Sequence, residues 1–134
     1  MILVDSSVWI DYFNGQETPQ VELLDQLLGT QPLAIGDIIL TEVLQGFRQD
    51  ADDATAKRLL TSLTLFQLLN PDLAIKSADN FRMLRKRGIT VRKTVDVIIA
   101  TFCIEAKHTL LFSDRDFIPC VQHLGLRTAV ESVS

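Results

Sequence analysis

Five acidic side chains stand where they could hold a metal ion or move a proton. They are Asp5, Glu42, Asp96, Asp114 and Asp116. Asp5 and Asp114 each follow a short apolar run, and Asp116 comes two residues later. Because ligands of parallel sheets bind beyond the carboxyl ends of the strands, we expect these three side chains to point into one crevice. Asp96 opens an apolar predicted helix that faces the same edge, and Glu42 borders the apolar face of another helix.

Each of these acids also has an ordinary structural explanation. Asp5 could cap a helix, Asp96 could interact with a helix N-terminus, and Asp114 could hold a turn. Together, carboxylates ~7 Å apart would repel by about 2 kcal/mol per pair at an effective dielectric near 20. That is a large cost against a total stability of ~5–15 kcal/mol. Protonation of one acid would relieve it, and a divalent cation would do so better.

A set of carboxylate oxygens without Cys or His favours Mg²⁺ or Mn²⁺. Such a site suits in-line phosphoryl chemistry, in which metal ions activate a water and stabilise the leaving oxygen. The acids therefore indicate a phosphoryl-transfer or hydrolytic centre.

The elements that would position these acids alternate along the chain. Apolar runs predict strands at residues 1–5, 32–36, 64–69, 108–112 and 126–130. The stretches between them predict helices at 6–13, 18–29, 38–47, 52–63, 70–88 and 94–106. Ser6 and Ser7 are expected to cap the first helix, and Asp37 the third. This alternation predicts an α/β fold, with a parallel sheet covered by helices on both faces.

Length and composition predict one domain over residues 1–134. A chain of 134 residues, 47% of them hydrophobic, can build a core without disulfides or a structural metal. Cys103 and Cys120 lie in unrelated contexts, so we expect buried thiols. No signal-peptide pattern opens the chain, and no apolar run approaches the ~20 residues of a membrane span. We therefore expect a cytoplasmic protein that does not contact a membrane.

The net charge of −4 argues against a simple basic nucleic-acid binder, but the charge is unevenly distributed. Residues 1–47 hold seven acids and no Lys or Arg, whereas residues 48–134 hold all thirteen bases and ten acids. Four of the candidate site acids alone account for four negative charges. The negative total is therefore weak evidence against RNA as a partner.

Four stretches of the chain carry these acids and their neighbours: MILVDSSVWIDYF, TEVLQG, VDVIIATFC and LLFSDRDF. Together they resemble the PIN-domain ribonucleases, in particular the VapC toxins of prokaryotic VapBC toxin–antitoxin pairs. The resemblance covers essentially the whole chain, and Asp-Ser-Ser-x-Trp-Ile is its most specific motif. It implies a PIN-like fold with a parallel sheet of about five strands.

The resemblance also assigns roles to the acids. The family's acidic quartet falls on Asp5, Glu42, Asp96 and Asp114, with Asp116 as an additional acid. It implies a Mg²⁺- or Mn²⁺-dependent endoribonuclease in which the Asp residues hold metal. Glu42 would bind metal through water or orient the attacking water. Between Asp114 and Asp116 we favour Asp114 as the direct ligand, since it is nearer the strand. The family typically cleaves structured RNA, often tRNA or ribosomal RNA, and is held inactive by a VapB antitoxin.

Basic residues near the acids are candidates for RNA phosphate contacts. Arg92 and Lys93 lie in a predicted loop just before Asp96 and are expected to bind phosphate. Arg115 could bind phosphate or neutralise the adjacent acids. Ser6 matches the family's Ser or Thr beside the first Asp and is a further candidate for substrate binding.

Packing and assembly can also be predicted. Trp9 is expected to belong to the core, whereas Tyr12 or Phe13 could face a partner. We also expect a homodimer. Exposed apolar residues on helices between 18 and 66 could form the dimer or antitoxin surface, or could simply pack in their own core.

Two other functions fit part of the sequence. An Asp-dependent phosphatase or phospho-receiver would use Asp5 as covalent acceptor, but Ser7 stands where the haloacid-dehalogenase pattern has a second Asp, and no Lys suits a receiver. A catalytically silent partner-binding domain would not need the intact acid set.

Overall fold

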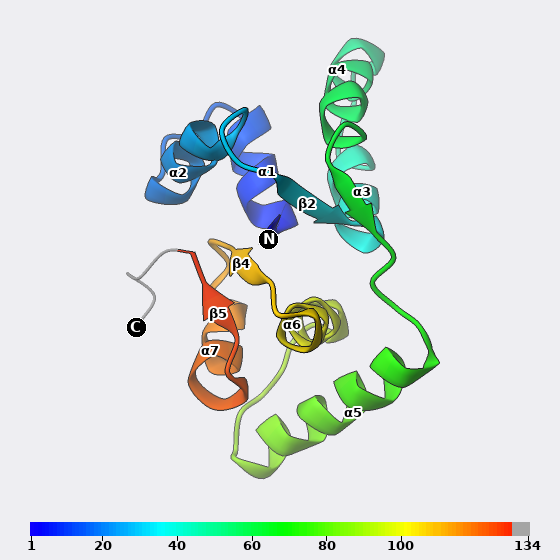
Figure 1. Ribbon diagram of the computed structural model, residues 1–134, viewed down its shortest axis with the longest axis vertical. Coiled ribbons are helices and arrows are strands. Elements are labelled where there is room, and N and C mark those ends of the chain that lie inside the picture. Colours follow the sequence, from blue (N-terminus) through cyan, green and yellow to red (C-terminus); the bar gives the residue numbers. More distant parts are fainter. Residues whose placement is uncertain (130–134) are drawn as a thin grey trace.

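Five short parallel strands form a single sheet at the centre of the protein. The computed structural model describes residues 1–129, and all statements below concern this part of the chain. The strands are β1 (Ile2–Val4), β2 (Leu33–Gly36), β3 (Thr64–Phe66), β4 (Thr109–Leu111) and β5 (Arg127–Thr128). Their order across the sheet is β3-β2-β1-β4-β5, as Figure 1 shows in part. The predicted α/β fold with about five parallel strands is confirmed.

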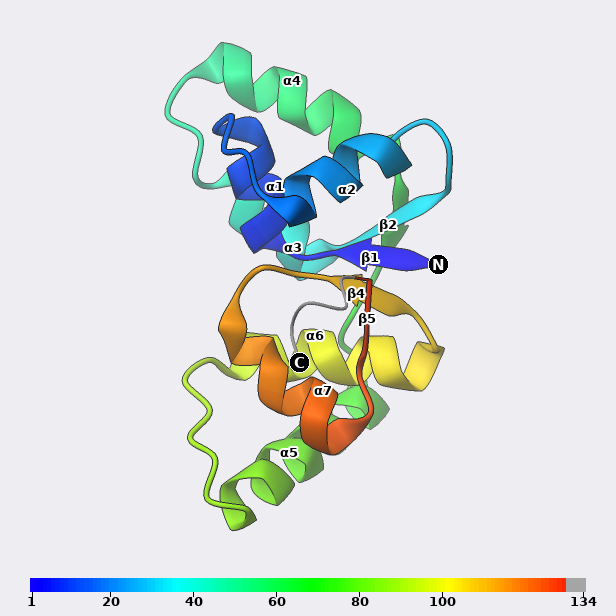
Figure 2. The same cartoon turned by 90° about the vertical axis from the view of Figure 1, so that its left-hand side faces the viewer.

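Helices cover both faces of this sheet. They are α1 (Ser6–Phe13), α2 (Pro19–Leu27), α3 (Asp37–Leu44), α4 (Asp50–Leu60), α5 (Pro71–Lys86), α6 (Thr94–Ala106) and α7 (Ile118–Leu124), with a 3₁₀ turn η1 at Arg115–Phe117. Figure 2 shows α1 to α4 on one side of the strands and α5, α6 and α7 on the other. Parallel crossovers are right-handed, so the helices change face where the strand order changes direction.

That change of direction occurs between β1 and β4. From β1 the chain builds outward through β2 to β3 and then returns to the other side of β1 as β4. Val4 pairs in register with Leu111, and the backbone N–H of Asp5 donates to the carbonyl of Leu111 at 2.9 Å. This topological switch point is where open α/β sheets bind ligands.

The core holds the switch point in place. Leu3, Val4, Leu110 and Leu111 are fully buried, as expected for central strands covered on both faces. Trp9 is fully buried on α1, which confirms its assignment to the core. Burying such apolar surface is the main force that fixes the strand ends.

Other packing predictions can be checked in the same way. Tyr12 and Phe13 are half-buried and make aromatic contacts with Trp9, with ring centroids 5.9 and 6.0 Å away. The predicted burial of Cys103 and Cys120 is confirmed.

Two strand predictions were too long. The predicted strand over 64–69 ends at Phe66, because Leu68 turns inward and is fully buried against the end of β2. A Cβ on Gly36 would lie 2.5 Å from Cδ1 of Leu68, so Gly36 makes room for this turn. The predicted strand over 126–130 is observed as Arg127–Thr128, and its last residue lies outside the described residues.

The helix starts also differ from expectation. The cap of α1 is Asp5 and not Ser6 or Ser7, and α4 begins at Asp50 rather than at residue 52. Asp37 is the first residue of α3 and not its cap. Its Oδ1 accepts from the N–H of Ile38 at 2.8 Å and of Leu68 at 3.2 Å, so it ties α3 to the segment after β3.

The segment from 115 to 124 is helical, which the sequence did not predict. Asp114 caps η1, and Pro119 stands in the first turn of α7, where it needs no hydrogen-bond partner. The sequence allowed for Asp114 holding a turn, and it does so here.

Within the described residues, no helix has both the length and the apolar character that a membrane span requires.

Candidate active site

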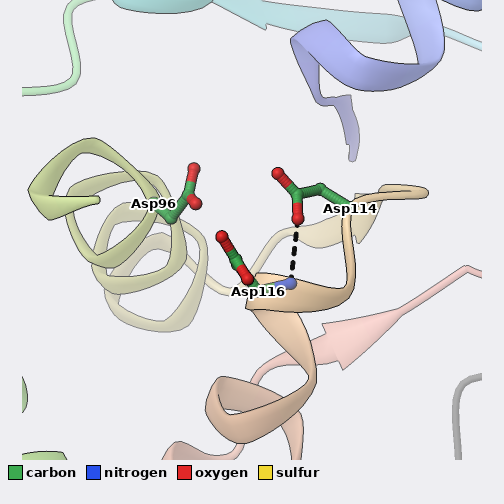
Figure 3. Close-up of side chains that lie close together, drawn as sticks. All are labelled: Asp96, Asp114 and Asp116. Atoms are coloured by element: carbon green, nitrogen blue, oxygen red, sulfur yellow. Dashed lines mark hydrogen bonds between the residues drawn. The ribbon is translucent and has the colours of Figure 1, made fainter. Parts of the chain in front are cut away.

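Three aspartates meet at the carboxyl edge of the sheet. Asp96, Asp114 and Asp116 each offer one carboxylate oxygen, and these three atoms lie within 4.8 Å of one another. Asp96 comes from the first turn of α6, whereas the other two come from the turn after β4. Figure 3 shows the three side chains directed toward a common space. Asp114 and Asp116 thus both belong to the cluster.

Asp114 shapes the turn that carries two members of the cluster. Its Oδ1 accepts from the backbone N–H of Asp116 at 2.9 Å, the dashed line in Figure 3. Its Oδ2 accepts from Nζ of Lys93 at 2.9 Å. Burial opposes its ionisation, but these two donors outweigh burial and lower the pKa of Asp114. Asp114 is therefore charged at neutral pH.

Asp96 is the most buried acid of the three. Its side chain is 9% exposed, and its Oδ2 is buried without a hydrogen-bond partner among the described residues. Burial, followed by the nearby charges of Asp5, Asp114 and Asp116, raises the pKa of Asp96 to about 7, although Lys93 opposes the rise. A buried carboxylate oxygen without a donor is costly unless a cation reaches it.

Asp5 lies at the end of β1, next to the cluster but outside its tight group. Its residue exposure is 3%, and its Oδ2 accepts from both the Oγ and the backbone N–H of Ser7, at 2.6 and 3.1 Å. Burial raises the pKa of Asp5 despite these hydrogen bonds, and the charge of Asp114 adds to the rise. The structural explanation, a helix cap, is therefore correct for Asp5, and its charge also acts on the cluster.

Ser7 joins the ends of the two central strands. Besides donating to Asp5, its Oγ accepts from the backbone N–H of Ser113 at 3.3 Å. The sequence predicted Ser7 as a helix cap, and nothing in its local pattern indicates a contact with residue 113. Ser7 therefore fixes Asp5 relative to the turn of Asp114.

Glu42 reaches the site from α3. Ser6 Oγ donates to its Oε1 at 3.2 Å, so Ser6 positions this acid. Burial and the charge of Asp5 raise the pKa of Glu42, against the effect of Ser6. Glu42 is thus close enough to feel Asp5 but is not part of the tight group of three.

Two cations neutralise part of this acidic charge. Nζ of Lys93 lies 3.8 Å from Oδ2 of Asp96 as well as 2.9 Å from Asp114, and Arg92 pairs with Asp116 at 3.3 Å. The hydrogen bond to Asp114 raises the pKa of Lys93, which therefore stays charged. Arg115 is exposed and makes no ion pair with any described residue. The role that the sequence allowed for Arg115, neutralising the acids, is carried by Arg92 and Lys93.

The donor set fits a hard divalent cation. All donors that converge here are carboxylate oxygens, and within the described residues no His or Cys joins them. The Oδ2 of Asp96 is buried and accepts no hydrogen bond from the described residues, and oxygen ligands are what Mg²⁺ and Mn²⁺ prefer. In contrast, the buried and hydrogen-bonded carboxylate of Asp5 is poorly placed to act as a covalent phosphate acceptor.

Comparisons with known proteins assign the chain to a family. Residues 2–119 match the model of the PIN domain family. The chain is 32% identical to a VapC ribonuclease of Mycobacterium bovis and to Ribonuclease VapC11 of Mycobacterium tuberculosis, over 96% of this chain and 98% of each relative.

Solved structures show the same fold. VapBC2 of Rickettsia felis, bound to a promoter DNA fragment, superposes with a TM-score of 0.75 at 16% identity, covering 96% of this chain and 97% of that one. VapC20 of M. tuberculosis, described as a sarcin-ricin loop cleaving toxin, gives 0.61 at 18% identity over 87% and 92%. The chain therefore belongs to the PIN-domain family, among the VapC ribonucleases.

Proposed function

We propose that this protein is a Mg²⁺- or Mn²⁺-dependent endoribonuclease that acts as the toxin of a toxin–antitoxin pair. The observation that carries the proposal is the group of three aspartates at the switch point of the sheet, with one buried oxygen left without a donor. Membership of the VapC ribonucleases supports RNA as the substrate.

The acids would share the work of holding the cation. Asp96 and Asp114 are the direct ligands in this proposal, because one comes from α6 and the other from the turn after β4, and both already pair with the ammonium of Lys93. Asp116 and Asp5 add negative charge to the site and serve as further ligands. When bound, a divalent cation supplies an activated water and neutralises the charge that develops on the leaving oxygen.

Glu42 is proposed to orient the attacking water. Ser6 holds its Oε1, whereas Oε2 makes no hydrogen bond to the described residues and can accept one from water. With a raised pKa, Glu42 can also take up the proton that this water loses. Ser6 would therefore act on the substrate through Glu42 or by contacting the RNA itself.

The substrate we propose is structured RNA, with tRNA or ribosomal RNA as the leading classes. Arg92, Lys93 and Arg115 surround the cluster and would contact phosphates, which should make RNA binding weaken with salt. The similar fold of VapC20, whose described target is the sarcin-ricin loop, supports a folded RNA loop. We therefore also propose a cytoplasmic location for the protein, where such RNA is found.

The partner we propose is a VapB-type antitoxin. Structures with this fold include VapBC complexes from Rickettsia felis and nontypeable Haemophilus influenzae. A homodimer is proposed as well, with its surface on exposed apolar helix residues. Co-expression with a candidate VapB-type antitoxin, followed by size-exclusion chromatography, tests both assemblies.

The direct test is cleavage of folded RNA by the purified protein. Wild type should cleave at defined sites with Mg²⁺ or Mn²⁺ and stop in EDTA. Asp5→Asn and Asp96→Asn, purified in parallel, should lose at least about a hundredfold in rate, as removal of essential charge usually does. Asp79→Asn, at an exposed position on α5, is the matched control and should cleave like wild type. Equal cleavage by all four proteins would mean a contaminating nuclease and refute the proposal.

A further inference from the structure

Lys93 occupies the place between two acids where a cation is needed. Its Nζ lies 2.9 Å from Oδ2 of Asp114 and 3.8 Å from Oδ2 of Asp96. These carboxylates come from the turn after β4 and from α6, so one ammonium joins the two sides of the cluster. At 3.8 Å it compensates the unpartnered oxygen of Asp96 by charge without a hydrogen bond.

A divalent cation held by the same oxygens would compete with this ammonium. Carboxylate oxygens bind Mg²⁺ at about 2.1 Å, so the metal would lie within a few ångströms of Nζ. Positive charges at such a distance repel strongly at the dielectric of a protein surface. The side chain of Lys93 is 54% exposed and has a flexible four-carbon stem, so it can move away without disturbing the core.

We propose that Lys93 is the built-in counter-ion of the metal-free site, and that a divalent cation displaces it and so frees its ammonium for a phosphate of the RNA. The destination of the ammonium rests on the proposed function. The exchange of ammonium for metal is a property of the protein alone. Lys93 would then be a substrate-binding residue whose ammonium can contact RNA only when metal is bound.

The neighbouring cations provide a natural comparison. Arg92 pairs with one acid, Asp116, at 3.3 Å, and its side chain is 77% exposed. Arg115 makes no ion pair with any described residue. Lys93, Arg92 and Arg115 therefore carry the same charge close to the site but neutralise two, one and none of its acids. If only net charge mattered, removing any one of the three would change metal affinity equally. The exchange instead predicts an effect on metal affinity that decreases from Lys93 to Arg92 to Arg115.

The first experiment measures the reactivity of the Lys93 amine in the full-length protein. Reductive methylation, followed by peptide mass spectrometry, is carried out with Mg²⁺ and with EDTA. Lys57 and Lys76 are internal controls, because they pair with Asp53 at 3.1 Å and Glu105 at 3.3 Å and are 57% and 53% exposed. Mg²⁺ should raise the labelling of Lys93 several-fold and leave both controls unchanged. Unchanged labelling of Lys93 at a Mg²⁺ concentration that raises the melting temperature would overturn the proposal.

The second experiment measures Mn²⁺ affinity without RNA, from the electron paramagnetic resonance signal of free Mn²⁺. Lys93→Met should bind Mn²⁺ about five- to tenfold more tightly than wild type, as expected when the metal no longer breaks existing ion pairs. Arg92→Met should show a smaller gain, and Arg115→Met should stay within about twofold. Equal gains in all three variants, or no Mn²⁺ binding by wild type and Lys93→Met, would overturn the exchange.

Neither readout depends on RNA cleavage. Exchange without cleavage would leave this inference standing and refute the proposed function. Cleavage without exchange would support the proposed function and refute this inference.

Discussion

Replacing Asp96 by Asn should stabilise the metal-free protein while disabling its site. The side chain is 9% exposed, and burial with the neighbouring acids raises its pKa to about 7 from an ordinary 3.8. Between about pH 4 and pH 7, the folded protein therefore keeps a proton on Asp96 that the unfolded chain has released. The contribution of this proton to stability is fully present below about pH 4 and is lost as the pH rises through about 7. At pH 8, the difference between these pKa values corresponds to roughly 4 kcal/mol of lost stability.

Asn has nearly the same shape and no charge, so Asp96→Asn should recover this loss. In EDTA at pH 8, we expect a gain of roughly 4 kcal/mol, or about 12 °C in melting temperature for a domain of this size. At pH 5 the folded wild type carries the proton, and the gain should shrink to about 1.5 kcal/mol.

The assay is thermal unfolding by circular dichroism at both pH values, with Asp79→Asn as the exposed control. Saturating Mg²⁺ should raise the melting temperature of wild type and not of the variant, because only the protein that binds the ion gains from it. A variant that is no more stable than wild type at pH 8 in EDTA would contradict this prediction. It would mean that Lys93 compensates the buried charge of Asp96 in full and not in part.

Three further outcomes are expected. Ser7→Ala removes the donor to the buried carboxylate of Asp5, so urea unfolding should show a loss of about 1–3 kcal/mol, and an unchanged midpoint would contradict this. Gly36→Ala places a methyl group 2.5 Å from Leu68 and should cost about 1–3 kcal/mol. Gly46→Ala, whose nearest atom would lie at 3.5 Å, should be neutral or stabilising, and equal losses at both glycines would contradict the packing argument. RNA binding measured in EDTA should weaken with salt through Arg92 and Arg115, and a flat salt dependence would exclude phosphate contacts by these two residues.

Much of the fold was predictable because its signals are local. The apolar runs of β1, β2 and β4 depend on adjacent residues, and so do the starts of α2 and α5, which Thr18 and Asn70 cap. The end of β3 at Phe66 was not predictable, since it depends on Leu68 packing over Gly36, a residue far away in the chain. The helical segment after Asp114 was missed because its first turn is 3₁₀ and is held by one side-chain cap.

The acids of the site were predictable, but their interactions were not. Their place at strand ends follows from the general rule for parallel sheets, and the structure brings Asp96, Asp114 and Asp116 together. Which cations neutralise them depends on side-chain reach between separate loops, and that information is not in the local sequence. The sequence predicted Lys93 as an RNA contact, which stays a prediction, but did not indicate that it pairs with two of the acids.

We propose that the cluster of Asp96, Asp114 and Asp116 holds a divalent cation for RNA cleavage. Anomalous diffraction from crystals soaked in Mn²⁺ tests it most directly, because the metal can be located without assuming its ligands. We predict one strong peak about 2.2 Å from carboxylate oxygens of Asp96 and Asp114, with the ammonium of Lys93 moved away. A cluster without a peak, or a peak elsewhere while Lys93 keeps both contacts, would show that these aspartates do not hold the cation.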